Sequence, residues 1–315
     1  MGAGMSSHAA GTLTAGPARV RPWLELLRVP NLATVPGDPL VGAVLASAVS
    51  GQPVPFRAAA GTAGAALCLY MAGLVLNDLH DLPDDRLRRP ERPLPRGVIS
   101  TRAAWRGFVV LAAAGLAAAG WVSGGTLIAG LGLLALICLY DLRAKSSPTW
   151  ACLVMGLCRG ANVLLGAAAM DRPGPALLPA AAWTLYIGAV TWLSRREDEV
   201  QRPGIPVLMP PLAMLAGGAA AWAPCWPLSI PVLAASAGCA ILALWPATRL
   251  SLGLFRRDAP PALARAAVGR YIGILLPWQA ALVVLGGTLP TAGAALALLV
   301  LWPASRRLAR RFNAS

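Results

Sequence analysis

The sequence predicts an all-α polytopic membrane protein with about nine to ten transmembrane helices. First, 57% of its 315 residues are hydrophobic and only 13% are charged, whereas soluble domains carry about 25% charged residues. Second, ten apolar runs recur along the chain, each close to the roughly 20 residues that a helix needs to cross a bilayer. Third, the cationic side chains concentrate in alternate connections between these runs, which is the positive-inside pattern of membrane proteins.

The apolar runs are rich in alanine, glycine and leucine, and such small residues let helices pack closely in lipid. In chain order they span residues 33–50, 57–78, 103–121, 125–141, 150–169, 177–194, 205–222, 228–246, 270–288 and 290–304. The last run is short and could instead lie at the membrane surface, so the sequence allows nine or ten crossings.

The segments outside the runs complete the expected domain organisation. Residues 1–18 are polar and rich in glycine and alanine, and we expect a disordered N-terminal tail there. Residues 19–304 form the membrane domain, and 305–315 form a basic cytoplasmic tail. The stretch 247–268 contains arginines and two adjacent prolines, which favours a connector lying on the membrane surface.

The charges also predict an orientation. One set of connections holds nearly all the cations, and the other holds only Arg57 and Arg172. This asymmetry predicts an integral protein of a bacterial inner or cell membrane, with both termini in the cytoplasm if ten spans are present. Most acids lie on the same side, with Asp38 and Asp171 as exceptions. Because the net charge of +14 is distributed in this way, it does not indicate a nucleic-acid partner.

The segment 77–86 carries the strongest chemical signal. Asp78, Asp81 and Asp85 are separated by three and four residues, which places their side chains on one helix face, and Asn77 joins Asp81 at an offset of four. Pro83 interrupts the helix, so the later acids can lie on a new first turn. Neighbouring carboxylates repel one another unless a cation lies between them, and oxygen ligands suit Mg²⁺. The alternative is an acidic loop that solvent surrounds.

The residues that follow turn this pattern into a resemblance. Arg89-Pro90, Arg92-Pro93-Leu94 and Gly97 follow the acids. The whole string resembles the signature N-D-x-x-D-x-x-x-D and R-P-x-R-P-[IL]-x-x-G of the UbiA superfamily of intramembrane prenyltransferases. Further similarity extends over the first two thirds of the chain. It covers the R-x-P-N opening at Arg28 to Asn31, the pair Tyr140 and Lys145, and the G-x-x-R-x-x-N pattern that ends at Asn162.

The resemblance implies a helix bundle around a central cavity that is open to lipid. It also implies Mg²⁺-dependent transfer of a prenyl group from a polyprenyl diphosphate to an aromatic or other electron-rich acceptor, with the mouth of the site in the cytoplasm. Expected metal ligands are Asn77, Asp78, Asp81 and Asp85. Residues expected to bind the diphosphate are Arg89, Arg92, Lys145 and Arg159. Residues expected to orient the acceptor or complete the site are Arg28, Asn31, Tyr140, Asp141 and Asn162.

The sequence departs from the family at the second acidic motif. Members usually carry D-x-x-x-D at the end of the sixth span, whereas this chain reads Ser194-Arg195-Arg196-Glu197-Asp198-Glu199. Glu197 and Asp198 could serve as second-metal ligands, the two arginines could replace that metal's charge, or the site could have lost turnover. The S-R-R-E string resembles a divergent branch, the EboC-type proteins.

Two other functions remain open at this point. An intact first motif with an altered second one also suits a non-catalytic component that binds or transports an isoprenoid diphosphate. A solute transporter fits less well, because its ionisable residues are expected near the middle of the bilayer. Here the acids are expected at span ends. The sequence does not indicate a protein partner.

Overall fold

The computed structural model describes residues 20–312, and helices form nearly all of its regular structure. An isolated bridge between Gln201 and Ala259 is the exception among these residues. The segment 1–18, expected to be a disordered tail, lies outside the described residues. The boundary expected at residue 304 falls inside the last helix, which continues to Phe312.

Among the described residues, the N-terminal half contains eight α-helices, two of which are shorter than seven residues. They are α1 (Arg21–Leu26), α2 (Val29–Leu32), α3 (Gly37–Ser50), α4 (Phe56–His80), α5 (Leu82–Arg88), α6 (Thr101–Val122), α7 (Gly124–Leu142) and α8 (Pro148–Ala168). The C-terminal half contains five long helices. They are α9 (Leu177–Ser194), α10 (Met209–Trp222), α11 (Ile230–Phe255), α12 (Pro261–Val283) and α13 (Leu289–Phe312).

Each of the ten apolar runs coincides with one of these helices, and nine helices in the described chain are long and apolar enough to span a membrane. The tenth, α3, has only 14 residues. The expectation that the last run is the short one is therefore wrong. Helix α13 continues past the apolar run into Arg306 and Arg307, because alanine, leucine and arginine all favour a helix.

The surface connector expected at 247–268 is much shorter in the structure. Residues up to Phe255 extend α11, and residues from Pro261 begin α12, so that only 256–260 connect the two helices. The alanines and leucines on both sides of the prolines are good helix formers. Pro261 takes the first position of α12, where a proline loses no helical hydrogen bond.

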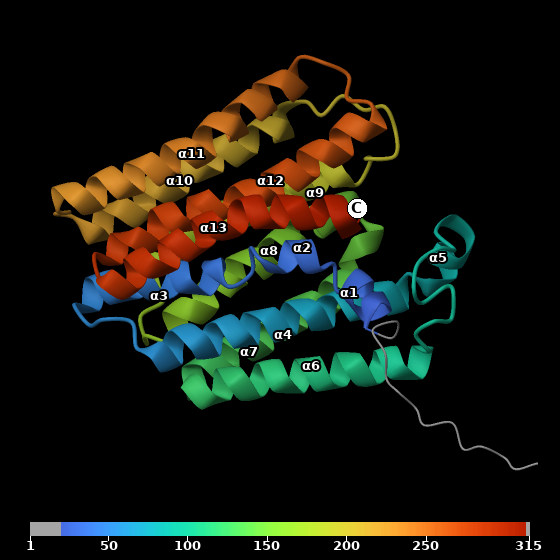
Figure 1. The fold of residues 1–315 in the computed structure, drawn as a ribbon, viewed down its shortest axis with the longest axis horizontal. Coiled ribbons are helices and arrows are strands. Elements are labelled where there is room, and N and C mark those ends of the chain that lie inside the picture. Colours follow the sequence, from blue (N-terminus) through green and yellow to red (C-terminus); the bar gives the residue numbers. More distant parts are fainter. Residues whose placement is uncertain (1–19, 313–315) are drawn as a thin grey trace, which may run out of the picture.

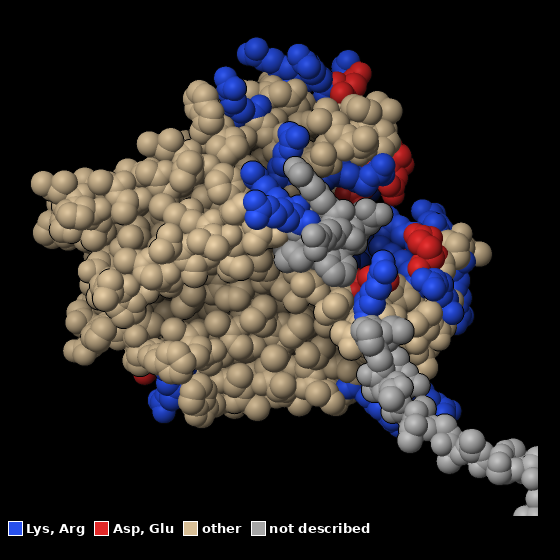
Figure 2. All heavy atoms as spheres, viewed as in Figure 1, with Lys and Arg blue, Asp and Glu red and all other residues tan. Residues whose placement is uncertain are grey.

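The long helices run side by side, and the chain reverses direction from one to the next (Figure 1). Most charged side chains gather at one end of this bundle (Figure 2). This charged end comprises residues 80–101, 142–148, 194–209 and 255–261, together with the C-terminal part of α13. The connections that carry most of the charges in the sequence therefore lie together at one end of the folded bundle.

The first crossing is broken between α2 and α3, and α3 packs against α8 at very short range. A Cβ on Gly42 would lie 1.9 Å from the Val163 carbonyl oxygen, and one on Gly166 would lie 1.8 Å from that of Pro39. Only glycine permits this approach, because any side chain would overlap the neighbouring backbone. The contact brings the first two turns of α3 against the last third of α8.

Candidate functional site

The acidic motif lies where α4 ends and α5 begins, at the charged end of the bundle. Helix α4 stops at His80, and Pro83 occupies the first turn of α5. The helical spacing nevertheless continues through the junction, because the Asp81 amide donates to the Asn77 carbonyl and the Asp85 amide donates to the Asp81 carbonyl, at 2.9 and 2.8 Å. The prediction that Pro83 starts a new first turn is confirmed, and the acids still share one face.

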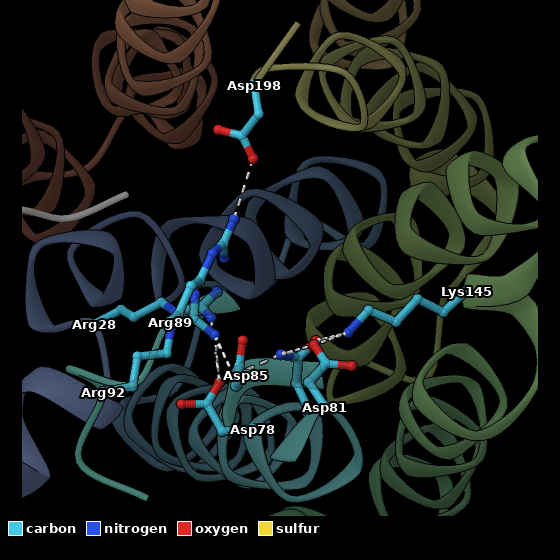
Figure 3. A network of polar contacts seen from close by, with 9 residues as sticks. Arg28, Asp78, Asp81, Asp85, Arg89, Arg92, Lys145 and Asp198 are labelled. Atoms are coloured by element: carbon cyan, nitrogen blue, oxygen red, sulfur yellow. Dashed lines mark hydrogen bonds and ion pairs between the residues drawn. The ribbon is translucent and has the colours of Figure 1, made fainter. Parts of the chain in front are cut away.

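Two guanidinium groups contact the buried carboxylates of this motif (Figure 3). Arg92 Nη1 lies 2.7 Å from Asp85 Oδ2 and 3.8 Å from Asp78 Oδ1, and Arg28 Nη2 lies 3.3 Å from the same Asp78 oxygen. Arg28 reaches this position from the junction of α1 and α2, where its backbone adopts a left-handed conformation with φ of 45°. This conformation costs a residue with a side chain about 1–2 kcal/mol, so surrounding contacts must hold it.

Lys145 closes the opposite side of the motif. Its ammonium group forms an ion pair with Asp81 and donates to Asn77 Oδ1 at 2.8 Å, and Asn77 Nδ2 donates to Asp81 Oδ2 at 3.3 Å. The Asp81 and Lys145 side chains remain 26% and 28% exposed. We call the set brought together here the mouth cluster: Arg28, Asn77, Asp78, Asp81, Asp85, Arg92 and Lys145.

The donor atoms of the mouth cluster suit Mg²⁺. Asn77, Asp78, Asp81 and Asp85 offer only oxygen ligands, and cationic side chains already occupy positions against their carboxylates. In the described part of the chain, no three His, Cys, Asp or Glu side chains converge closely enough to hold a metal alone. Mg²⁺ commonly uses one or two carboxylates and completes its shell with water and phosphate oxygens, so the residues fit a metal that arrives with a phosphate ester.

An apolar cavity of about 160 Å³ extends from the mouth cluster into the bundle. Arg28 and Asn77 line its outer part, and Arg159 and Asn162 line it on α8. Asp141, which also lines it, is 3% exposed, and its Oδ1 has no hydrogen-bond partner among the described residues. Tyr140 and Asp141 thus border the cavity, as does Tyr70, which the sequence analysis did not identify.

Arg159 and Asn162 contact a second acid, deeper in the bundle. Arg159 Nε lies 3.0 Å from Asp38 Oδ2, and Asn162 Nδ2 donates to the same oxygen at 3.3 Å. Trp183 Nε1 and Gln279 Nε2 donate to Asp38 Oδ1 at 2.8 and 2.6 Å. We call Asp38, Arg159, Asn162, Trp183 and Gln279 the buried network.

The buried network corrects two expectations. Asp38 is 0% exposed, and about 20 Å of helix separates it from the C-terminal end of α3 at Ser50. It therefore lies inside the bundle and not at the end opposite the other acids. The middle of the bundle is also not free of ionisable residues. The sequence contained a signal for this network, because Asp38 and Gln279 interrupt apolar runs. Such residues are costly in a membrane unless they are paired.

The altered second motif lies across the mouth, in the connection after α9. Asp198 accepts from Arg89 at 3.5 Å (Figure 3) and from Arg265 at 2.9 Å. Burial raises the pKa of Glu197, and the Asp198 carboxylate adds to this effect, whereas nearby guanidinium groups oppose it. Arg195 donates to the Lys145 carbonyl at 3.2 Å. The connection is therefore tied to the mouth cluster through arginines, and Arg265 is a partner that the sequence analysis missed.

Asn31 is the remaining predicted residue. It lies in α2, and its backbone carbonyl accepts from the Thr34 hydroxyl at 3.0 Å. Thr34 in turn accepts, through its own carbonyl, from Arg159 and Gln279 at 3.2 and 2.7 Å. The break between α2 and α3 thus joins the region of the mouth cluster to the buried network.

Comparisons with known proteins agree with this fold. The chain is 31% identical to a digeranylgeranylglyceryl phosphate synthase of Pyrococcus abyssi over 160 residues, which cover 49% of this chain and 55% of that protein. It is 33% identical to one from Methanopyrus kandleri over 162 residues, covering 50% and 56%. The chain thus matches about half the length of these curated relatives, which are not EboC-type proteins.

Solved structures show the same architecture over most of the chain. A structure described as that of a digeranylgeranylglyceryl phosphate synthase in membranes aligns with a TM-score of 0.62 and 19% identity, covering 85% of this chain and 98% of that one. A UbiA homologue from Archaeoglobus fulgidus, bound to DMAPP and Mg²⁺, aligns with a TM-score of 0.56 and 16% identity, covering 82% and 98%. At these identities the likeness establishes the fold.

The family follows from the sequence. The model of the UbiA prenyltransferase family matches residues 39–258, which include the complete acidic motif and the altered connection after α9. This match covers well over half of the 315 residues. The chain is therefore an integral membrane protein that belongs to the UbiA prenyltransferase family.

Proposed function

We propose that the chain transfers a prenyl group from a prenyl diphosphate to an acceptor within the membrane, in a Mg²⁺-dependent reaction. The mouth cluster supports this proposal best, because it places carboxylates and cations together at the charged end of an apolar cavity. A diphosphate joined to a hydrocarbon chain has the same division between a charged head and an apolar body.

The ion pairs of the mouth cluster suggest how the substrate is accommodated. Arg92 and Lys145 lie against Asp85 and Asp81, and both cations can move onto phosphate oxygens when the carboxylates receive a metal. Guanidinium groups bind phosphate through paired hydrogen bonds. When bound, Mg²⁺ would draw negative charge onto the leaving diphosphate. Arg89, which now contacts Asp198, can add a further cation at the same opening.

We infer that the acceptor supplies a hydroxyl group. Asp141 Oδ1 and Asn162 Oδ1 are buried beside the cavity, and neither has a partner among the described residues. An unpaired buried oxygen costs about 1–3 kcal/mol, and an acceptor hydroxyl that donates to one of them removes this cost. The relatives named digeranylgeranylglyceryl phosphate synthases favour a glyceryl phosphate acceptor over an aromatic one.

The test is a transfer assay with the purified chain. Labelled geranylgeranyl diphosphate and Mg²⁺ are supplied with geranylgeranylglyceryl phosphate or with an aromatic acid. We expect diphosphate release and prenylation of the glyceryl phosphate. Asp81→Asn should lower the rate by at least about a thousandfold, because metal stabilisation of the transition state contributes several kcal/mol.

The matched control is Asp84→Asn, since Asp84 belongs to the same acidic segment but is exposed. This variant should keep its rate. Mg²⁺-dependent binding of a non-hydrolysable prenyl diphosphate analogue gives a second measurement, and Asp81→Asn should weaken it. Turnover at the full rate in Asp81→Asn would contradict the metal assignment.

One observation favours a second function, which is binding of an isoprenoid diphosphate without turnover. Asp198, the candidate second-metal ligand, contacts two arginines, and a carboxylate held in this way is less available to a metal. Saturable, Mg²⁺-dependent binding of the labelled diphosphate, with no release and no product from any acceptor, would support this alternative.

A further inference from the structure

A groove of about 520 Å³ lies between α11, α12 and α13, and it shares no residue with the mouth cluster or the cavity. It is formed by the last part of α11, the first half of α12 and the C-terminal part of α13. All three parts adjoin the charged end of the bundle (Figure 1).

Four arginines line this groove, and the described residues that line it include no acid. Arg249 and Arg257 come from α11 and the residues after it, Arg270 from α12 and Arg306 from α13. Arg249, Arg257 and Arg270 form no ion pair with a described residue. In the mouth cluster, by contrast, each cation is matched by a carboxylate.

The acid closest in sequence does not supply the missing charge. Asp258 follows Arg257 directly, but it pairs with Arg202 at 2.7 Å. Arg249, Arg257 and Arg270 place three like charges around one concave surface, which attract an anion of matching size. The groove therefore carries a positive potential that no described acid on its lining neutralises.

Two tryptophans hold arginines of the groove in place. The Arg249 guanidinium lies 4.8 Å from the centre of the Trp245 ring, and that of Arg306 lies 4.4 Å from the Trp302 ring. Cations over indole rings are stabilised by the ring's electrons, and tryptophan concentrates at the level of the lipid headgroups. An arginine held against a tryptophan is the arrangement expected where a helix meets the lipid headgroups.

The floor of the groove is apolar and follows α11 into the membrane. Leu254 and Ile274 line it and are 2% and 1% exposed. Trp245 lies ten residues before the end of α11, which is about 15 Å along the helix axis. Trp245, Leu242 and Leu252 are 62%, 48% and 49% exposed, so this side of α11 faces lipid.

We propose that the groove binds an anionic phospholipid, with its phosphate among the arginines and one acyl chain along the apolar floor. The guanidinium groups suit a phosphate, because each can donate two parallel hydrogen bonds to its oxygens. The apolar length and the lipid-facing side of α11 select a membrane lipid over a soluble phosphate, which would leave the floor unfilled.

The test is native mass spectrometry of the full chain in detergent, with phosphatidylglycerol or phosphatidylcholine of identical acyl chains. The chain should retain phosphatidylglycerol preferentially, and a large excess of inorganic phosphate should not displace it. The variant R249Q/R257Q/R270Q should lose this preference. We expect about a fivefold loss of affinity for each arginine removed and on the order of 100-fold for three.

The matched control is R96Q/R102Q/R106Q, which removes three exposed arginines outside the groove. This control should bind phosphatidylglycerol as the unmodified chain does. If the triple groove variant does not fold, as judged by thermal unfolding without lipid, the single variant R249Q should still show about a fivefold loss.

Four outcomes would overturn the proposal. They are equal retention of both lipids, unchanged binding in the groove variant, full displacement by inorganic phosphate, and a dimer of the chain that the groove substitutions dissolve. The last outcome would assign the groove to a second copy of the protein. None of these results depends on prenyl transfer, so the groove is tested independently of the proposed function.

Discussion

The mouth cluster and the buried network both pair aspartates with arginines, but they differ in their access to solvent. The Asp81 side chain is 26% exposed and contacts a lysine that is also partly exposed. Asp38 is 0% exposed, and three side chains besides Arg159 donate to it. Water, a metal or a phosphate can replace a partner in the first region, whereas solvent does not reach the Asp38 carboxylate of the second.

This difference separates the two roles that an ion pair can have in a membrane protein. A buried charge whose partner is removed costs several kcal/mol, because nothing else compensates it. A partly exposed pair contributes about 0–1 kcal/mol, because water solvates either member alone. The mouth cluster should therefore affect activity more than stability, and the buried network should affect stability more than the activity of the folded molecules.

The largest expected effect on stability is that of Asp38→Ala. The substitution leaves Arg159 without its carboxylate, and it removes the acceptor of Trp183 and one of the two acceptors of Gln279. The free energy of unfolding should fall by about 3–5 kcal/mol, measured as thermal or denaturant unfolding in detergent.

Asp84→Ala is the control for this prediction, since it removes an exposed acid and should change stability by less than about 0.5 kcal/mol. Equal stability of Asp38→Ala and the unmodified chain would remove the distinction between the two regions.

The sequence singled out the residues that meet in the mouth cluster, because they are local or belong to a recognisable pattern, whereas their roles stay predictions. Asn77, Asp81 and Asp85 lie on one helical face by spacing alone, and the structure brings Lys145 to them. The ten apolar runs likewise locate ten helices. Periodicity reports local helical structure, and composition reports the membrane environment. Both kinds of prediction agree with the structure.

Asp38 and Gln279 stood out because they interrupt apolar runs, but the contacts of the buried network could not be predicted, because its members come from four separate helices. Asp38, Arg159, Trp183 and Gln279 lie on α3, α8, α9 and α12. Their contacts depend on how the helices pack, including the close approach at Gly42 and Gly166. The length of the connection between α11 and α12 was missed for another reason, since prolines near a helix start do not end the helix.

A double-mutant cycle on Asp38 and Arg159 should give the next largest effect. Asp38→Asn and Arg159→Gln each leave one buried charge without its partner, whereas the double variant removes both charges. The double variant should be more stable than the sum of the single effects predicts, by about 2–3 kcal/mol. A coupling near zero would mean that the pair is solvated after all, as the mouth cluster is.

Arg92→Lys tests whether the mouth cluster affects activity more than stability. Arg92 contacts both Asp78 and Asp85 through Nη1, and a lysine cannot reproduce the planar, two-fold contact of a guanidinium with a phosphate. We expect kcat/KM for the prenyl diphosphate to fall by about tenfold, which corresponds to about 1.4 kcal/mol, with little change in thermal stability.

Arg86→Lys is the matched control for Arg92→Lys, because Arg86 is exposed on α5, in the segment just before Arg92, and the change should leave kcat/KM unchanged. If Arg92→Lys instead lowered the unfolding temperature as Asp38→Ala does, the mouth cluster would be a structural element.

Glu197→Gln should have the smallest effect. It tests a partly buried carboxylate that belongs to neither the mouth cluster nor the buried network. Because burial and Asp198 raise the pKa of Glu197, the folded chain disfavours the ionised carboxylate relative to the unfolded chain. Removing the charge should therefore stabilise the protein slightly at pH above this raised pKa and have no effect below the unfolded pKa, where both states are protonated.

The gain from Glu197→Gln should not exceed a few tenths of a kcal/mol, because the side chain is partly exposed and solvent screens its interactions. Unfolding temperatures at neutral and acidic pH, with and without Mg²⁺, measure it. If the variant is stabilised without the metal but gains less from Mg²⁺ than the unmodified chain does, Glu197 is a ligand despite its cost. If Mg²⁺ stabilises both chains equally, the metal binds through the mouth cluster alone, and the arginines beside Glu197 take over the charge of a second ion.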